Sequence, residues 1–147
     1  MATPENQAKI EQLMAYRNAR FSCMALTNEI ERTRELGEKI TVSFNGMPGV
    51  AEPGAKVGTA ASILADLERD FQDQLERLHR TQQGVTEAID TLEREDLKGI
   101  LRLRYINGFK WSTIADMVGY DVRHVTRLHG VALALLPSAE ELEKKMS

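Results

Sequence analysis

The sequence predicts an all-α protein in which a long N-terminal helical hairpin or coiled coil precedes a C-terminal helix-turn-helix module. Three observations support this fold class. Apolar residues recur at intervals of three and four over most of the chain, as they do on one face of a helix. Aromatic residues make up only 5% of the 147 residues and prolines number four, which disfavours a sheet-rich sandwich or barrel. Finally, three short helical patterns separated by glycine-containing turns lie near the C-terminus.

Charge and composition divide the chain into three predicted regions. Residues 1–94 carry a net charge of −4, residues 95–136 carry +2 and residues 137–147 carry −1, within an overall charge of −3. We expect a coiled-coil or oligomerisation region, a module whose positive charge permits a phosphate-facing surface, and a charged tail, respectively. No run approaches the ~20 apolar residues that cross a bilayer. With no secretory pattern and Cys23 as the single cysteine, we expect a cytoplasmic protein that does not associate with membranes, and a core position for Cys23.

The first predicted helix runs from about Pro4 to Glu38. Thr3 supplies a hydroxyl cap, and proline suits the first helical turn. Residues 41–58 then contain six glycines and prolines, so we expect a connector without helix there. The alternation of apolar residues over 40–44 favours one short extended piece before the connector.

From Thr59 the apolar spacing is the most regular in the chain. Nine positions follow one another at intervals of three or four, and only one of them is polar: Leu64, Leu67, Phe71, Leu75, Leu78, Gln82, Val85, Ile89 and Leu92. Such a seam predicts one long helix that must bury this face against a partner. The partner is either the first helix, folded back as an antiparallel hairpin, or a second copy of the chain in a homodimer. Gly84 within the seam predicts a kink or the close approach of another helix.

The last third has the landmarks of a helix-turn-helix. One helical pattern runs from Glu95 to Ile106 and stops at Asn107-Gly108. We expect Ser112 to cap the next helix, and Asp121 to cap a last helix that stops at Pro137.

Between these two helices, the residue types match what a tight helix crossing requires. Ala115 is small enough for two helices to cross closely, and Gly119 tolerates the positive φ of a tight turn. Apolar residues from both helices are expected beneath the turn: Ile114, Val118, Val125 and Leu128. We therefore predict a helix-turn-helix rather than an ordinary three-helix bundle.

The same geometry selects candidate DNA contacts. If Val125 and Leu128 face inward, four residues on the first turn and a half of the last helix face outward and are candidates to read bases: Arg123, His124, Thr126 and Arg127. Three basic residues before the turn are better suited to phosphates: Arg102, Arg104 and Lys110. Trp111 is expected to anchor the core.

This part of the chain resembles the fourth region of bacterial sigma factors. The resemblance lies in Leu101–Gly108, Trp111–Ala115, Val122–His129 and Ala132–Leu136. Together with the helical N-terminal part, the chain looks like phage and prophage late-gene transcription regulators of the ArpU and RinA type. The resemblance implies a major-groove reader that works with bacterial RNA polymerase at promoter DNA, in the cytoplasm of a bacterial host, with its base readers near the start of the last helix.

Other classes of function find little support in the sequence. His124 and His129 are five residues apart and share no helix face, so a metal site is not expected. No set of nucleophile, base and orienting residue stands out, and we expect neither an enzyme nor a cofactor. The expected function is a sequence-specific regulator that binds double-stranded DNA. The alternatives are an adaptor that binds polymerase or another regulator without gripping DNA, and a phage DNA-packaging subunit.

Overall fold

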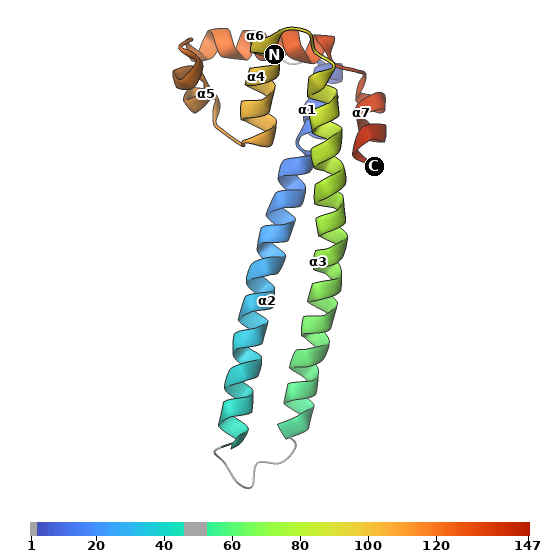
Figure 1. The fold of residues 1–147 in the computed structure, drawn as a ribbon, viewed down its shortest axis with the longest axis vertical. Coiled ribbons are helices and arrows are strands. Elements are labelled where there is room, and N and C mark those ends of the chain that lie inside the picture. Colours follow the sequence, from blue (N-terminus) through green and yellow to red (C-terminus); the bar gives the residue numbers. More distant parts are fainter. Residues whose placement is uncertain (1–2, 46–52) are drawn as a thin grey trace. The chain divides into compact units, whose positions relative to one another are not determined.

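The computed structural model describes the backbone of residues 3–45 and 53–147, and the side chains of residues 3–39 and 58–147. The regular elements in these ranges are helical (Figure 1), which confirms the all-α fold class. In chain order they are α1 (Pro4–Leu13), α2 (Ala15–Asn45), α3 (Pro53–Asp90), α4 (Glu95–Leu101), the π-helix η1 (Arg102–Ile106), α5 (Trp111–Val118), α6 (Val122–Leu135) and α7 (Ala139–Met146). None of the helices described combines the length and the apolar surface that crossing a membrane requires.

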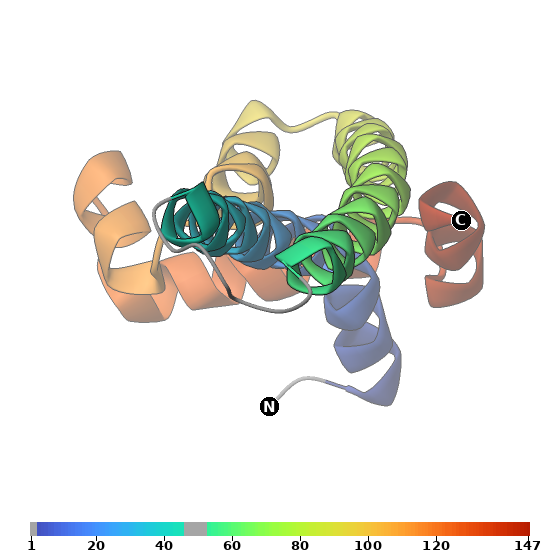
Figure 2. The same cartoon turned by 90° about the horizontal axis from the view of Figure 1, so that it is seen from below.

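The helices form two compact units. One comprises residues 1–20 and 77–147, and the other comprises residues 21–76. In the second unit, which we call the hairpin unit, α2 and α3 run side by side in opposite directions (Figures 1 and 2). The sequence allowed two partners for the α3 seam, the first helix or a second copy of the chain. Within the chain, the partner is the first helix.

The seam by which α3 packs differs from the predicted one. One set of buried and half-buried positions alternates at intervals of three and four: Leu64, Leu67, Phe71, Gln74, Leu78, Thr81, Val85 and Ala88. The predicted seam residue Ile89 is also fully buried. Leu75 and Gln82 are exposed, so neither belongs to the face of α3 that packs within the chain. The predicted run contains two successive steps of four, from Leu67 to Leu75. Seven residues return to nearly the same face of a packed helix, whereas these two steps span eight, so Leu75 lies further round the helix than the packing face.

The predicted boundaries of the first helix and the connector also need correction. The helix breaks at Met14, and this break lets α1 pack against α6 and α7. α2 continues to Asn45, so the expected extended piece at 40–44 is wrong. α3 already begins at Pro53, because a proline is compatible with the first helical position and the glycines after it cost only about 1 kcal/mol each. Of the predicted connector at 41–58, residues 46–52 lie outside the described ranges.

The first unit has one apolar core beneath α6. α6 packs against α1, α4 and α5, and the core draws on every described helix of this unit. Its buried members include Leu13, Ile89, Leu97, Ile100, Leu101, Ile114, Val125 and Leu133. A continuous core of this kind fixes the helices around it, because interior side chains pack as tightly as in organic crystals.

The predicted charged tail is wrong, because residues 139–146 form α7. Leu142 is fully buried and Met146 is 8% exposed. The expected close helix approach at Gly84 is confirmed: a Cβ there would lie 2.6 Å from the Lys145 carbonyl oxygen of α7. The acidic and basic residues that suggested a solvated tail occupy the outer face of an amphipathic helix.

Two polar side chains of α1 hold the corner between α6 and α7. Lys9 is 5% exposed, and its ammonium donates to the Leu133 carbonyl at 2.7 Å and to the Leu136 carbonyl at 3.2 Å. The Glu5 carboxylate accepts from the backbone N–H of Ala139 at 2.9 Å. A cation at the end of α6 and an anion at the start of α7 both match the helix dipoles.

Candidate nucleic-acid interface

The turn between α5 and α6 has the conformation that the sequence predicts. Gly119 adopts φ 77° and ψ 24°, in the left-handed region. The backbone N–H groups of Gly119 and Tyr120 both donate to the Ala115 carbonyl, at 3.0 and 3.1 Å. Asp121 then caps α6 by accepting from the His124 N–H at 2.7 Å. The turn is thus fixed from both sides within three residues.

The start of α5 differs from the prediction. The helix begins at Trp111 with Lys110 at the cap position, and no side chain caps it. Ser112 is therefore a first-turn residue rather than the cap, and its prediction as the cap is wrong. Ser112 and Thr113 are exposed. An uncapped helix start with exposed hydroxyls is suited to accept an anion.

The apolar residues predicted beneath the turn are buried there. Ile114 and Val125 are fully buried, Ala115 is 2% exposed and Leu128 is 8% exposed, while Val118 is half-buried. These contacts fix the rotation of α6 about its axis. As a result, the face opposite Val125 and Leu128 points away from the core.

Three of the four predicted base readers are exposed on the first two turns of α6: Arg123, Thr126 and Arg127. His124 is half-buried, and its ring meets the Tyr120 ring edge-on at 4.7 Å. The Arg127 guanidinium donates to His124 Nδ1 at 2.6 Å. A neutral His124 in this arrangement carries its ring proton on Nε2 and presents a donor there.

Thr126 uses its hydroxyl proton within the helix. Its Oγ1 donates to the Val122 carbonyl at 2.8 Å. The methyl group and the oxygen lone pairs remain available on the exposed face. Such a side chain can contact a thymine methyl group or accept from a base amino group.

A stack of side chains supports α6 from the side of η1 and α5. The Tyr105 hydroxyl and His129 Nε2 share a hydrogen bond of 2.7 Å, and both side chains are buried. The Trp111 ring is centred 4.5 Å from the His129 ring. The Arg104 guanidinium lies 4.7 Å from the centre of the Trp111 ring, as in a cation–π contact. Trp111 is half-buried and packs against the core, as predicted.

The buried pair has shifted ionisation. Desolvation, with a smaller contribution from Arg104, lowers the pKa of His129 to about 4. Burial raises the pKa of Tyr105 well above its ordinary value. Both groups are therefore neutral near pH 7, and the hydrogen bond between them is one between uncharged partners. His129 was not singled out as a supporting residue by the sequence, because a histidine on an apolar helix face has no pattern of its own.

The three predicted phosphate contacts have different surroundings. Arg102 pairs with Asp90 at 3.1 Å on the surface. Arg104 donates to the Phe109 carbonyl at 3.1 Å, besides its contact with Trp111. Lys110 is exposed at the start of α5. The structure therefore places Arg104 and Lys110 beside α5, whereas Arg102 is engaged with an acidic partner.

Exposed apolar residues surround the turn, and the sequence pattern did not assign them to a site. Met117 is 56% exposed, Tyr120 is 45% exposed and Val122 is 44% exposed. All three lie within five residues of Gly119. Apolar side chains at this position can contact thymine methyl groups or a protein partner.

Among the described residues, no three His, Cys, Asp or Glu side chains lie close enough together to hold a metal ion. Comparisons with protein families, with characterised proteins and with solved structures found no match to this chain.

Proposed function

We propose that this chain is a sequence-specific regulator that binds double-stranded DNA and reads the major groove with the start of α6. The observation that carries the proposal is the exposure of Arg123, Thr126 and Arg127 on a helix whose opposite face is held in the core. The major groove, about 12 Å wide, admits one helix of about 10–12 Å diameter. A helix with one fixed and one exposed face can enter it in a single orientation.

The charge of the module supports the same assignment. α6 contains two arginines and no acidic residue, and residues 95–136 carry a net charge of +2 within an acidic chain. Arg127 can donate to a guanine edge, which is the commonest specific contact in the major groove. Lys110 and the uncapped start of α5 are suited to a phosphate beside the groove.

The resemblance to the fourth sigma region extends the proposal to promoter DNA. We propose that the chain acts there together with bacterial RNA polymerase, as that resemblance implies. The module would position promoter DNA, and polymerase would carry out transcription. The sequence itself shows no set of nucleophile, base and orienting residue.

The test is fluorescence anisotropy with a duplex first selected from a random-sequence pool. Arg127→Ala should weaken binding to that duplex by about 1–3 kcal/mol, roughly tenfold to a hundredfold, and relax the preference at one base pair. Arg102→Ala should have a smaller and sequence-independent effect, because Arg102 already has Asp90 as a partner.

The matched control is Arg69→Ala, which removes the same charge from an exposed position in the hairpin unit. It should bind the selected duplex as the wild type does. Equal losses in Arg127→Ala and Arg69→Ala would show that α6 does not read the groove. Circular dichroism of each variant checks that the fold is retained.

A second candidate function is the adaptor, and one observation favours it. Val131 is 38% exposed and Leu135 is 59% exposed, one turn apart on the second half of α6. Apolar side chains there suit a protein partner better than a phosphate backbone. For an adaptor, co-sedimentation with bacterial RNA polymerase should be weakened by Leu135→Asp and unaffected by Arg127→Ala, and no duplex should bind.

A further inference from the structure

We propose that one side of the hairpin unit is the interface of a homodimer, in which two copies of the chain pair about a two-fold axis. This side, the groove face, comprises residues of α2 and α3 around a shared hollow: Met24, Thr27, Ile30, Glu31, Arg34, Glu68, Phe71, Gln72 and Leu75. The inference concerns self-association alone and does not depend on DNA binding.

The hairpin unit buries too little of its own apolar surface. Among residues 21–39 and 58–76, whose side chains the structure describes, only Cys23 and Ile30 are buried. The seam residues Leu64, Leu67 and Phe71 remain half-exposed although they face the partner helix. Two helices alone cannot enclose such a seam. Helical hairpins achieve this by forming a four-helix bundle.

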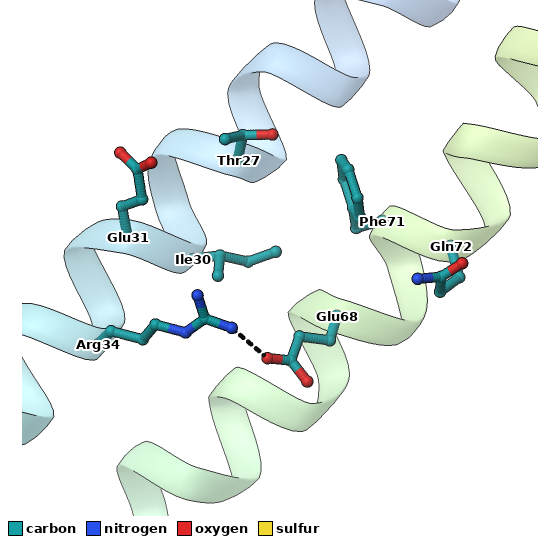
Figure 3. Close-up of a pocket in the computed structure, with 7 residues that line it drawn as sticks. All are labelled: Thr27, Ile30, Glu31, Arg34, Glu68, Phe71 and Gln72. Carbon is teal, nitrogen blue, oxygen red and sulfur yellow. Dashed lines mark hydrogen bonds and ion pairs between the residues drawn. The ribbon is translucent and has the colours of Figure 1, made fainter.

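A hollow lies on one side of the hairpin (Figure 3). It has a volume of about 330 Å³ and opens between α2 and α3. Ile30 and Phe71 reach into the space between the two helices, and the Arg34–Glu68 ion pair of 2.9 Å crosses it at one end. The hollow thus has an apolar interior and a polar end.

Two exposed apolar side chains belong to the same side as this hollow. On α2, Met24 is three residues from Thr27, which lines the hollow; on α3, Leu75 is three residues from Gln72, which also lines it. Residues three apart lie on the same side of a helix. Met24 is 58% exposed and Leu75 is 41% exposed. The groove face therefore carries two protruding apolar side chains and an apolar hollow within a few turns of each other.

This combination fits a second copy of the chain. In a two-fold interface the same patch serves both partners, so it must be complementary to itself. In shape, the groove face can meet this requirement if Met24 and Leu75 of each copy enter the hollow of the other copy. The patch carries charges of both signs, and its one arginine, Arg34, already pairs with Glu68 within the same chain.

Sedimentation velocity of the full chain over a range of micromolar concentrations tests the proposal. The wild type should form dimers. Leu75→Glu and Met24→Glu should each raise the dimer dissociation constant roughly a hundredfold or more, since the dimer would have to bury an unpaired carboxylate. Both positions are exposed in the single chain, so circular dichroism should show unchanged helix content.

The matched control is Ile63→Glu. Ile63 is also an exposed apolar residue of α3, at 48%, but it is twelve residues from Leu75 and thus about a third of a turn away around the helix. This variant should dimerise as the wild type does. A monomeric wild type, an assembly larger than a dimer, or an Ile63→Glu variant that dissociates as readily as Leu75→Glu would each overturn the proposal.

Discussion

His129, on the inner face of α6, is buried in neutral form, and this makes the module sensitive to acid. Its pKa is lowered to about 4, mainly by desolvation, from an ordinary value near 6.5. Between these two pH values the unfolded chain binds a proton at this position and the folded chain does not. Stability from this group is therefore complete above pH ~6.5 and is lost progressively as the pH falls to about 4.

We predict that this loss amounts to about 3 kcal/mol between pH 7 and pH 4. Urea unfolding followed by circular dichroism at several pH values measures it. Carboxylates contribute to the same curve, so His129→Gln is the reference, because glutamine does not titrate. If the wild type and His129→Gln lose stability in parallel as the pH falls, the histidine is not buried in neutral form.

Gly119 is the residue on which the turn depends. Its φ of 77° lies where a side chain adds strain, so Gly119→Ala should destabilise the fold by roughly 1–2 kcal/mol. Gly130→Ala is the control, because Gly130 lies within α6 and an added Cβ would meet nothing within 4 Å. Alanine should be neutral or stabilising there. Thermal unfolding of the two variants should show opposite shifts, and equal shifts would contradict the account.

Single residues differ in how far the sequence could place them. Gly119 and Asp121 were predicted correctly, because a positive φ and a helix cap each require particular residue types. Lys9 could not be predicted as a buried residue, since its acceptors are carbonyl groups more than 120 residues away in the chain. The same holds for the Tyr105–His129 pair, whose partners meet only after folding.

At the level of elements, η1 is a feature that periodicity did not reveal. The Asn107 N–H donates to the Arg102 carbonyl at 3.0 Å, five residues back, as in a π-helix. The Asn107 side-chain amide donates to the same carbonyl at 3.1 Å. η1 carries both Arg104 and Tyr105, so the wider turn determines how these side chains meet α5 and α6. Five residues are too few for their apolar spacing to distinguish a π-helix from an α-helix.

The contact between α3 and α7 gives a prediction at this scale. A Cβ at Gly84 would lie 2.6 Å from the Lys145 backbone oxygen and 2.8 Å from the Met146 sulfur. Gly84→Ala should therefore force α7 outward and destabilise the fold by about 1–3 kcal/mol, despite the better helix propensity of alanine.

Gly99→Ala is the control for this prediction, because Gly99 lies within α4 and has open space around it. Chemical denaturation should rank Gly84→Ala below the wild type and Gly99→Ala at or above it. A Gly84→Ala variant as stable as the wild type would mean that α7 does not pack against α3.

α7 has a weak signal in the sequence. Only Leu142 and Met146 mark its inner face, and two apolar residues do not make a clear helical period. Apolar character alone places Leu75 on the α3 seam, whereas strict heptad spacing places Gln74 there. Glutamine and threonine at heptad positions, Gln74 and Thr81, carry no apolar signal although they occupy the packing face.

At the level of the whole molecule, the fold class and the helix-turn-helix followed from periodicity and turn residues, which act locally. The division into two compact units depends on which helices meet, and the sequence did not predict it. The candidate contacts on α6 could be grouped from the sequence because a single helix carries them. The ion pair of Arg102 could not be predicted, since its partner Asp90 is the last residue of a different helix, α3.

The most direct test of the central claim is the salt dependence of DNA binding by the wild-type chain. Anisotropy with a mixed-sequence duplex should show saturable binding at low salt. The logarithm of the association constant should fall linearly with the logarithm of salt concentration, with a slope of about −0.9 for each phosphate contacted. A single-stranded oligonucleotide should bind more weakly, because it offers no major groove. If no duplex binds at the lowest salt concentration, the account is contradicted.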